Sequence, residues 1–159
     1  MTTHVRIEPL TAAAFAPYGD VLDASGPPDR IINEGLCERF HDRARLDFGP
    51  DGRAGISIFR AEPRSLPLTL GAIERHPDGS QAFVPLTADP FLVIVASGPG
   101  GQVRAFRTAP GQAINILRNT WHGALTPLTG SGLFAVIDRI GPTANLEEHR
   151  LTPALVISD

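Results

Sequence analysis

The stretch FLVIVA, residues 91–96, is the longest unbroken apolar run of the chain and decides the reading of the fold. Its length and its β-branched residues predict a strand that is buried on both faces or lines the interior of a barrel. Three further stretches predict strands: residues 113–117, residues 133–140, and an alternating segment that contains Ile56, Ile58 and Arg60.

Turn-forming residues separate these stretches at fairly even spacing. Clusters of Gly, Pro, Ser and Asp occupy residues 25–28, 49–52, 97–101 and 129–132. Many short strands between such turns are typical of a β-sandwich or barrel. Helical periodicity is scarce: one short helix is predicted near residues 11–15, where Thr11 can cap its start. We therefore expect an all-β protein with one or two short helices, forming a single domain over residues 1–159.

The composition excludes several classes of protein. The formal net charge is −3, so no nucleic-acid-binding surface is indicated. All cationic side chains other than histidine are arginine, which excludes a Schiff-base lysine and leaves arginine to bind anions. Cys37 is the only cysteine, so neither a disulfide framework nor a cysteine-based zinc site is expected. No stretch resembles a signal peptide or a membrane span, which predicts a cytoplasmic protein that binds no membrane.

Two polar stretches carry the candidate chemistry: ERHPDGSQ at residues 74–81 and NTWH at residues 119–122. Glu74 and His76 are two residues apart, so in a strand they point to one face. The Pro-Asp-Gly-Ser turn can fold Gln81 back beside them, and His122 would complete the group from a second hairpin. Such a group can hold a divalent metal, or it can act without metal as an acid–base group. The structural alternative is that both histidines only stabilise turns.

Candidates for substrate binding lie elsewhere in the chain. Arg39 and His41 share a face of an extended segment and could bind a carboxylate; the alternative, which we favour from the sequence, is a surface strand with solvated charges. Arg60 ends an apolar strand, where an arginine needs an anionic partner from the protein or a ligand. Trp121 could wall the pocket beside His122 or simply belong to the core. Residues 147–149, Glu-Glu-His, are predicted to form an exposed turn or short helix.

The order and spacing of these motifs resemble the ureidoglycolate lyase family over nearly the whole chain. The resemblance is carried by PYGDV at 17–21, INEG at 32–35, ERFHD at 38–42, SIFRA at 57–61, the 74–83 block, Trp121-His122 and Asp138-Arg139. It implies a cupin-like double-stranded β-barrel of the jelly-roll type and a homodimer. The implied reaction cleaves ureidoglycolate, a small molecule, to glyoxylate and urea.

The same resemblance implies roles for individual residues. Glu74, His76, Gln81 and His122 would occupy the places where other cupins carry metal ligands, and nickel is the metal associated with the family. Asn33, within the 32–35 motif, would join the substrate-binding residues. The chain departs from its relatives at two points: Ile116-Leu117 stands where a tyrosine and a polar residue are common, and Gly123 where a second histidine or a tyrosine is common.

These residues support a mechanism without a covalent intermediate. His122 or His76 would take the hydroxyl proton of the substrate, and Glu74 would orient a histidine or return the proton. Arg39 or Arg60 would bind the carboxylate through a charge-assisted pair. Two alternatives stay open: a non-catalytic module that binds a small carboxylate, and the ureidoglycolate hydrolase reaction, which releases ammonia.

Overall fold

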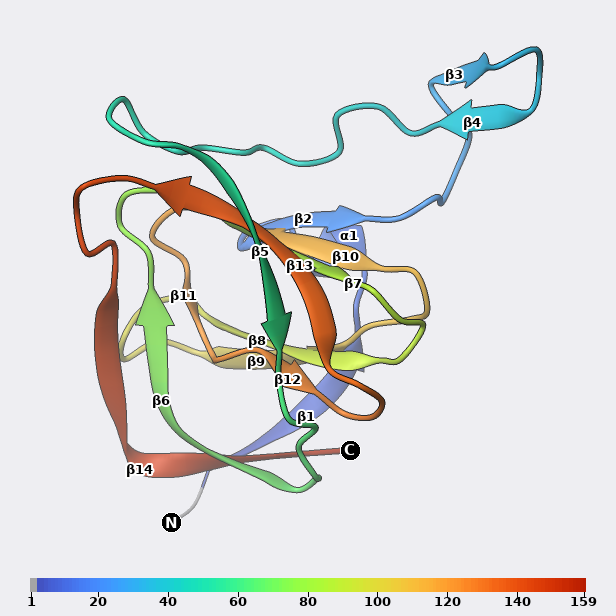
Figure 1. Cartoon of the computed structure of the whole chain (residues 1–159). Coiled ribbons are helices and arrows are strands. Elements are labelled where there is room, and N and C mark those ends of the chain that lie inside the picture. The colour runs from blue at the N-terminus through green and yellow to red at the C-terminus, as the bar shows by residue number, and fades with distance from the viewer. Residues whose placement is uncertain (1–2) are drawn as a thin grey trace.

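A computed structural model describes residues 3–159 and is almost entirely β-structure (Figure 1). Strand β8 (Phe91–Ala96) is buried along its whole length, as its sequence predicts. Its side chains alternate between two cores, because successive residues of a strand point to opposite faces. One core receives Phe91, Val93 and Val95, and the other receives Leu92, Ile94 and Ala96.

One of these cores fills a closed, mixed barrel of six strands. The ring closes because the short strand β11 (Trp121–His122) pairs with β6 (Leu68–Arg75) on one side and with β8 on the other. Strand β1 (Thr3–Pro9) is parallel to both of its neighbours in the ring. The ring also contains β14 (Glu147–Ser158) and β9 (Val103–Arg107), and β12 (Thr126–Pro127) pairs with β8 beside it.

A second sheet packs against the outer face of β8 and encloses the other core. Phe83 and Val136 from this sheet lie in one buried cluster with Val93 and Val95 of β8. The arrangement is that of a cupin-like β-barrel, as expected. The five strands, in spatial order, are β2 (Gly19–Leu22), β10 (Ala113–Ile116), β7 (Gln81–Pro85), β13 (Leu133–Ile140) and β5 (Arg53–Arg60).

The predicted helix is present as α1 (Ala12–Phe15), the one helix within residues 3–159. The Thr11 side chain accepts a hydrogen bond from the backbone N–H of Ala14 at 3.2 Å, which satisfies one free donor of the first turn. Phe15 is fully buried, and its ring meets Phe106 edge-on at 5.8 Å between centroids. The helix therefore closes one end of the core. It is far too short to span a membrane, and the described residues hold no longer apolar helix.

Strands β3 (Arg30–Ile32) and β4 (Cys37–Arg39) form a separate two-stranded sheet. We call the hairpin of residues 30–39 the arm. Figure 1 shows the arm standing away from the rest of the molecule, joined to it by extended segments on both sides. The arm pairs with no other strand of the described chain.

Candidate metal centre and active site

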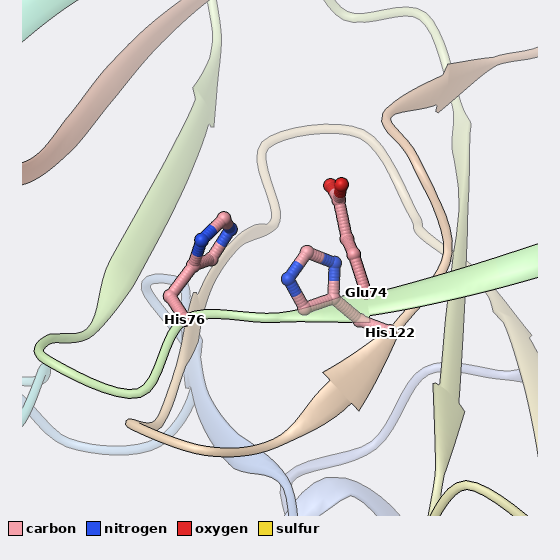
Figure 2. A group of neighbouring side chains, drawn as sticks. All are labelled: Glu74, His76 and His122. Carbon is pink, nitrogen blue, oxygen red and sulfur yellow. The ribbon is translucent and has the colours of Figure 1, made fainter. Parts of the chain in front are cut away.

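Glu74, His76 and His122 form a compact group at the end of strand β6 (Figure 2). His122 in β11 lies directly opposite Glu74 in β6, so both side chains leave the same face of the sheet. His76 follows the last residue of β6 and precedes the Pro77 turn. One ligand-competent atom from each residue lies within 4.8 Å of the others. The two segments that the sequence predicts to meet therefore do meet.

Both imidazoles are held in a defined tautomer by backbone carbonyls. Nδ1 of His76 lies 2.8 Å from the carbonyl oxygen of Asn145, and Nδ1 of His122 lies 2.9 Å from that of Gly123. A carbonyl oxygen can only accept, so each Nδ1 carries the hydrogen and each Nε2 keeps a lone pair. Both Nε2 atoms are buried and have no hydrogen-bond partner. This second contact of each ring is the arrangement that orients metal-binding histidines.

Burial determines the protonation state of His122. Removal from water lowers the pKa of His122 to about 4; proximity to His76 also lowers it, and the Gly123 carbonyl opposes the shift. The imidazole is therefore neutral near pH 7. A neutral ring with a free Nε2 lone pair is ready to accept a proton from substrate or to bind a cation.

The face that carries the group runs from the core to the surface. Across β8, β11, β6 and β14, the register places Val95, His122, Glu74 and Glu148 in one row. Val95 and His122 are buried, Glu74 is half-buried and Glu148 is exposed. A hollow of about 170 Å³ beside Glu74 and Glu148 is also lined by Ala72, Ile73 and Ala124. The site is thus reached from the β14 side.

The sequence prediction for residues 147–149 was wrong, since they belong to strand β14 rather than to a turn or helix. Because β14 pairs with β6, Glu148 lies directly opposite Glu74. Residues 147–150 are all polar or charged, so no alternation of apolar and polar residues marks this part of the strand in the sequence.

Gln81 approaches the same layer from the second sheet. It starts β7 opposite Asp138 of β13, and its Nε2 donates to Asp138 Oδ2 at 3.1 Å. Gln81 and Phe83 are two residues apart in β7, so their side chains point to the same face. Phe83 lies in one buried cluster with Val95. Gln81 therefore faces the layer between the sheets, into which His122 also points. Its Oε1 atom is buried and without a partner. Gln81 therefore offers a free acceptor on the opposite wall.

Two predicted substrate-binding residues point elsewhere. Trp121 leaves β11 on the opposite face from His122 and belongs to the barrel core. There Arg75 stacks over its ring at 5.0 Å, and the His149 ring meets it at 6.0 Å. Arg60 ends β5 on the face of Ile56 and Ile58, opposite to the face that packs inward through Phe59 and Phe83.

The remaining predicted substrate-binding residues lie on the arm or directly after it. Asn33 lies in its turn, Arg39 ends β4, and His41 follows two residues later. Figure 1 shows the arm, with β3 and β4, standing away from β6 and β11, which carry Glu74 and His122.

The two departures from the family pattern fall on different faces. Ile116 is buried in the core between the sheets, opposite Gln81 in the register. Gly123 follows His122 and faces the barrel interior, where an added Cβ would lie 3.1 Å from the Cβ of Ile94. A larger residue at position 123 would therefore press on Ile94 rather than stand beside the His122 ring.

A cupin-like barrel with a carboxylate and two imidazoles converging between its sheets defines a class of small-molecule sites that commonly hold a divalent metal. The model of one family, described as ureidoglycolate lyase, matches residues 2–158. The chain belongs to the ureidoglycolate lyase family.

Individual relatives agree with the family match. A protein of Rhodobacter capsulatus named ureidoglycolate lyase is 60% identical over 156 residues, which cover 96% of this chain and 97% of that protein. Ureidoglycolate lyase 2 of Rhizobium meliloti is 51% identical over 90% of each chain. Ureidoglycolate lyase of a Chelativorans species is 53% identical over 145 residues, which cover 89% of this chain and 88% of that protein.

Proposed function

We propose that this protein is a carbon–nitrogen lyase that cleaves ureidoglycolate to glyoxylate and urea. The observation that carries the proposal is the pair of buried, unpartnered Nε2 atoms of His76 and His122 beside the carboxylate of Glu74. The names of the relatives supply the substrate, and this group supplies the chemistry that such a substrate needs.

The free groups of the site are all electron-pair donors. They comprise two imidazole nitrogens, the Glu74 carboxylate and the amide oxygen of Gln81. A divalent cation fits this set, and nickel is the metal that the family resemblance suggests. Glu74, His76 and His122 would hold it, with Gln81 as the fourth ligand expected from the sequence. Bound there, the metal would supply positive charge to the hydroxyl and carboxylate oxygens of the substrate.

The reaction moves one proton and breaks one bond. Ureidoglycolate carries a hydroxyl, a carboxylate and the urea nitrogen on one carbon. When the hydroxyl loses its proton, the C–O electron pair forms the aldehyde of glyoxylate and the C–N bond breaks. The released nitrogen then takes up a proton and leaves as urea. No nucleophile is required, which agrees with a chain that has no lysine.

His76 is the better placed of the two histidines to remove the hydroxyl proton. It is half-buried, whereas His122 is fully buried and resists protonation, with a pKa of about 4. Its Nδ1–H donates to the Asn145 carbonyl, which keeps Nε2 free to accept the proton. In this scheme, which applies to the site without a metal, His122 orients the substrate through its Nε2 lone pair. His76 passes the proton that it removed to the Glu74 carboxylate, and Glu74 gives it to the leaving nitrogen.

The ureido group needs acceptors for its N–H bonds, and Gln81 can supply one. Asp138 accepts from Nε2 of Gln81 and so fixes the amide with Oε1 turned away from it. The free Oε1 then receives an N–H of the ureido group. A homodimer and a cytoplasmic location complete the proposal, as the resemblance and the sequence composition imply.

The direct test is to incubate the purified protein with ureidoglycolate and to measure urea, ammonia and glyoxylate separately. Equal amounts of urea and glyoxylate support the lyase. Ammonia in place of urea would assign the hydrolase reaction instead. Binding without turnover, measured by calorimetry, would make the protein a carboxylate-binding module. A His122→Asn variant serves as the matched negative control in each assay.

A further inference from the structure

The arm exposes apolar side chains that nothing in its own chain covers. Ile31 is 64% exposed, and Leu36 at the tip is 88% exposed. A two-stranded hairpin is only marginally stable in water by itself. An isolated hairpin with its apolar residues in solvent therefore indicates a missing contact surface.

The conformation of the arm adds to this argument. Three consecutive residues of its turn, Asn33, Glu34 and Gly35, have positive φ angles of 55°, 59° and 87°. Glycine adopts such angles freely, but for a glutamate they cost roughly 1 kcal/mol or more. Such a turn persists where its surroundings hold it, but all three residues are exposed, and Figure 1 shows the hairpin standing away from the rest of the molecule.

The arm also carries two unpaired cations on one face. Arg30 and Arg39 lie directly opposite each other in the β3–β4 register. Like charges in this relation destabilise a hairpin unless an anion lies between them. Neither guanidinium forms an ion pair or side-chain hydrogen bond within residues 3–159. This face of the arm is therefore suited to bind carboxylates.

A complementary surface lies along β5, at the edge of the five-stranded sheet. Strand β5 pairs with β13 alone, so one side of its eight-residue backbone is free. Its outer face exposes Ile56 and Ile58, which are 73% and 62% accessible. Long, apolar edge strands are normally covered. The inner face of β5 borders the layer between the sheets through Phe59, and Gly55 of β5 lies opposite Asp138, which holds Gln81. A segment lying along this edge is therefore beside the wall that carries Gln81.

The site itself supplies carboxylates but few cations. Asp138 and Glu74 face the layer between the sheets, and Glu148 lies at its mouth. Among the described residues of β8, β11, β6 and β14, one arginine lies on the face that carries His122. This is Arg150, which lies opposite Ala72 and two residues beyond Glu148. Two further arginines near this layer already have anionic partners: Arg104, opposite Val95, pairs with Glu8, and Arg118, which precedes the segment bonded to the His76 carbonyl, pairs with Asp47. An arginine without such a partner would therefore have to come from outside this row.

We propose that the arm of a second copy of this chain docks along β5 and places Arg39 in the active site, where its guanidinium binds the substrate carboxylate. The pairing is reciprocal, because each copy offers one arm and one β5 edge. Arg30 and His41 accompany Arg39, and the acidic groups at the mouth of the site complement this cationic face. This inference rests on the proposed lyase activity.

Complementation between two inactive variants tests the shared site. Arg39→Ala removes the guanidinium that the arm supplies, and His76→Gln removes the base that the rest of the chain supplies. The two variants are mixed, unfolded and refolded together. If the site is shared, half of the random pairs are mixed and each mixed pair holds one complete site. Activity then returns to about a quarter of the wild-type value. An Arg6→Ala variant, which removes an exposed arginine of β1, should keep full activity.

Recovery of activity in the mixture supports the proposal. An inactive Arg39→Ala with no recovery, or an active Arg39→Ala, overturns it. If the wild-type protein itself shows no turnover, the proposed function has failed, and the oligomeric state then decides the docking separately. Light scattering should show a dimer for the wild type and a monomer for Ile56→Glu/Ile58→Glu. A double variant that stays dimeric, or a monomeric wild type, excludes docking at β5.

Discussion

The imidazole rings of His76 and His122 lie 5.1 Å apart, centroid to centroid, although His76 follows β6 and His122 belongs to β11. Each ring donates its Nδ1–H to a backbone carbonyl, so the pair presents two Nε2 lone pairs from a rigid frame. Two neutral imidazoles and one carboxylate can share either a metal or a proton, and the predictions below separate these functions.

His76 should be required for turnover and dispensable for folding. We expect His76→Gln to lower kcat by about 10²–10⁴-fold, the range for loss of a general base. Because His76 is half-buried at a turn, the fold should be retained, and circular dichroism would show this. His4→Gln, which changes an exposed histidine of β1, is the matched control and should leave kcat unchanged.

The Glu74–His76–His122 group should bind a divalent metal with a measurable gain in stability. A metal at about 100 times its Kd adds about 2.7 kcal/mol, which is a rise in Tm of several degrees for a chain of this size. Nickel added to chelator-treated protein should therefore raise Tm, and His122→Asn should abolish the rise. In His149→Asn, whose imidazole lies on the other face, the rise should remain. Equal rises in both variants would place the metal elsewhere.

Acid should destabilise the metal-free protein in a window that belongs to His122. Its pKa is about 6.5 when unfolded and about 4 when folded, so the unfolded state binds more protons between these values. Stability is complete above pH 6.5 and decreases as the pH falls toward 4, by about 3 kcal/mol in total. Urea unfolding at several pH values would measure the slope. His122→Asn should flatten it, and an unchanged slope in this variant would assign it to other groups.

The fold could be predicted from the sequence where a local pattern of residues is compatible with only one kind of structure. The run at residues 91–96 is apolar at every position, and such a strand must be buried on both faces, as β8 is. Thr11 before a short alanine-rich segment predicts the helix and its cap, and both are present. The closure of the barrel through the two-residue strand β11 could not be predicted, because the strands that pair with β11 are remote from it in sequence.

The candidate site could also be predicted in part, because some of its geometry follows from local patterns. The sequence predicted that His122 joins Glu74 and His76 from a second segment, and the β6–β11 register together with the grouping of the three side chains confirms this. Whether a given face of a strand lies in a core or in solvent depends on which other sheet packs against that face. Trp121 thus faces the barrel core, and Arg60 faces outward with Ile56 and Ile58. An alternating strand shows which residues share a face but not whether that face is buried by its own chain.

The Asp20 carboxylate should be a larger source of stability than an exposed ion pair. It accepts from the backbone N–H and Nε of Arg45, at 2.8 and 2.9 Å, and from Nδ2 of the fully buried Asn115 at 3.0 Å. These bonds attach the segment after the arm to strand β10. Their number explains why the pKa of Asp20 is lowered although partial burial acts to raise it.

Removing this carboxylate takes an acceptor from the buried Asn115 amide and two bonds from Arg45, whereas the members of an exposed pair are already in contact with water. We therefore expect Asp20→Ala to lower the free energy of unfolding by about 2 kcal/mol. Arg43→Ala breaks the solvent-exposed pair with Asp29 and should cost less than about 1 kcal/mol. Urea unfolding at pH 7 measures both values. Equal losses in the two variants would show that the Asp20 network contributes no more than a surface pair, and that the segment after the arm is held by other contacts.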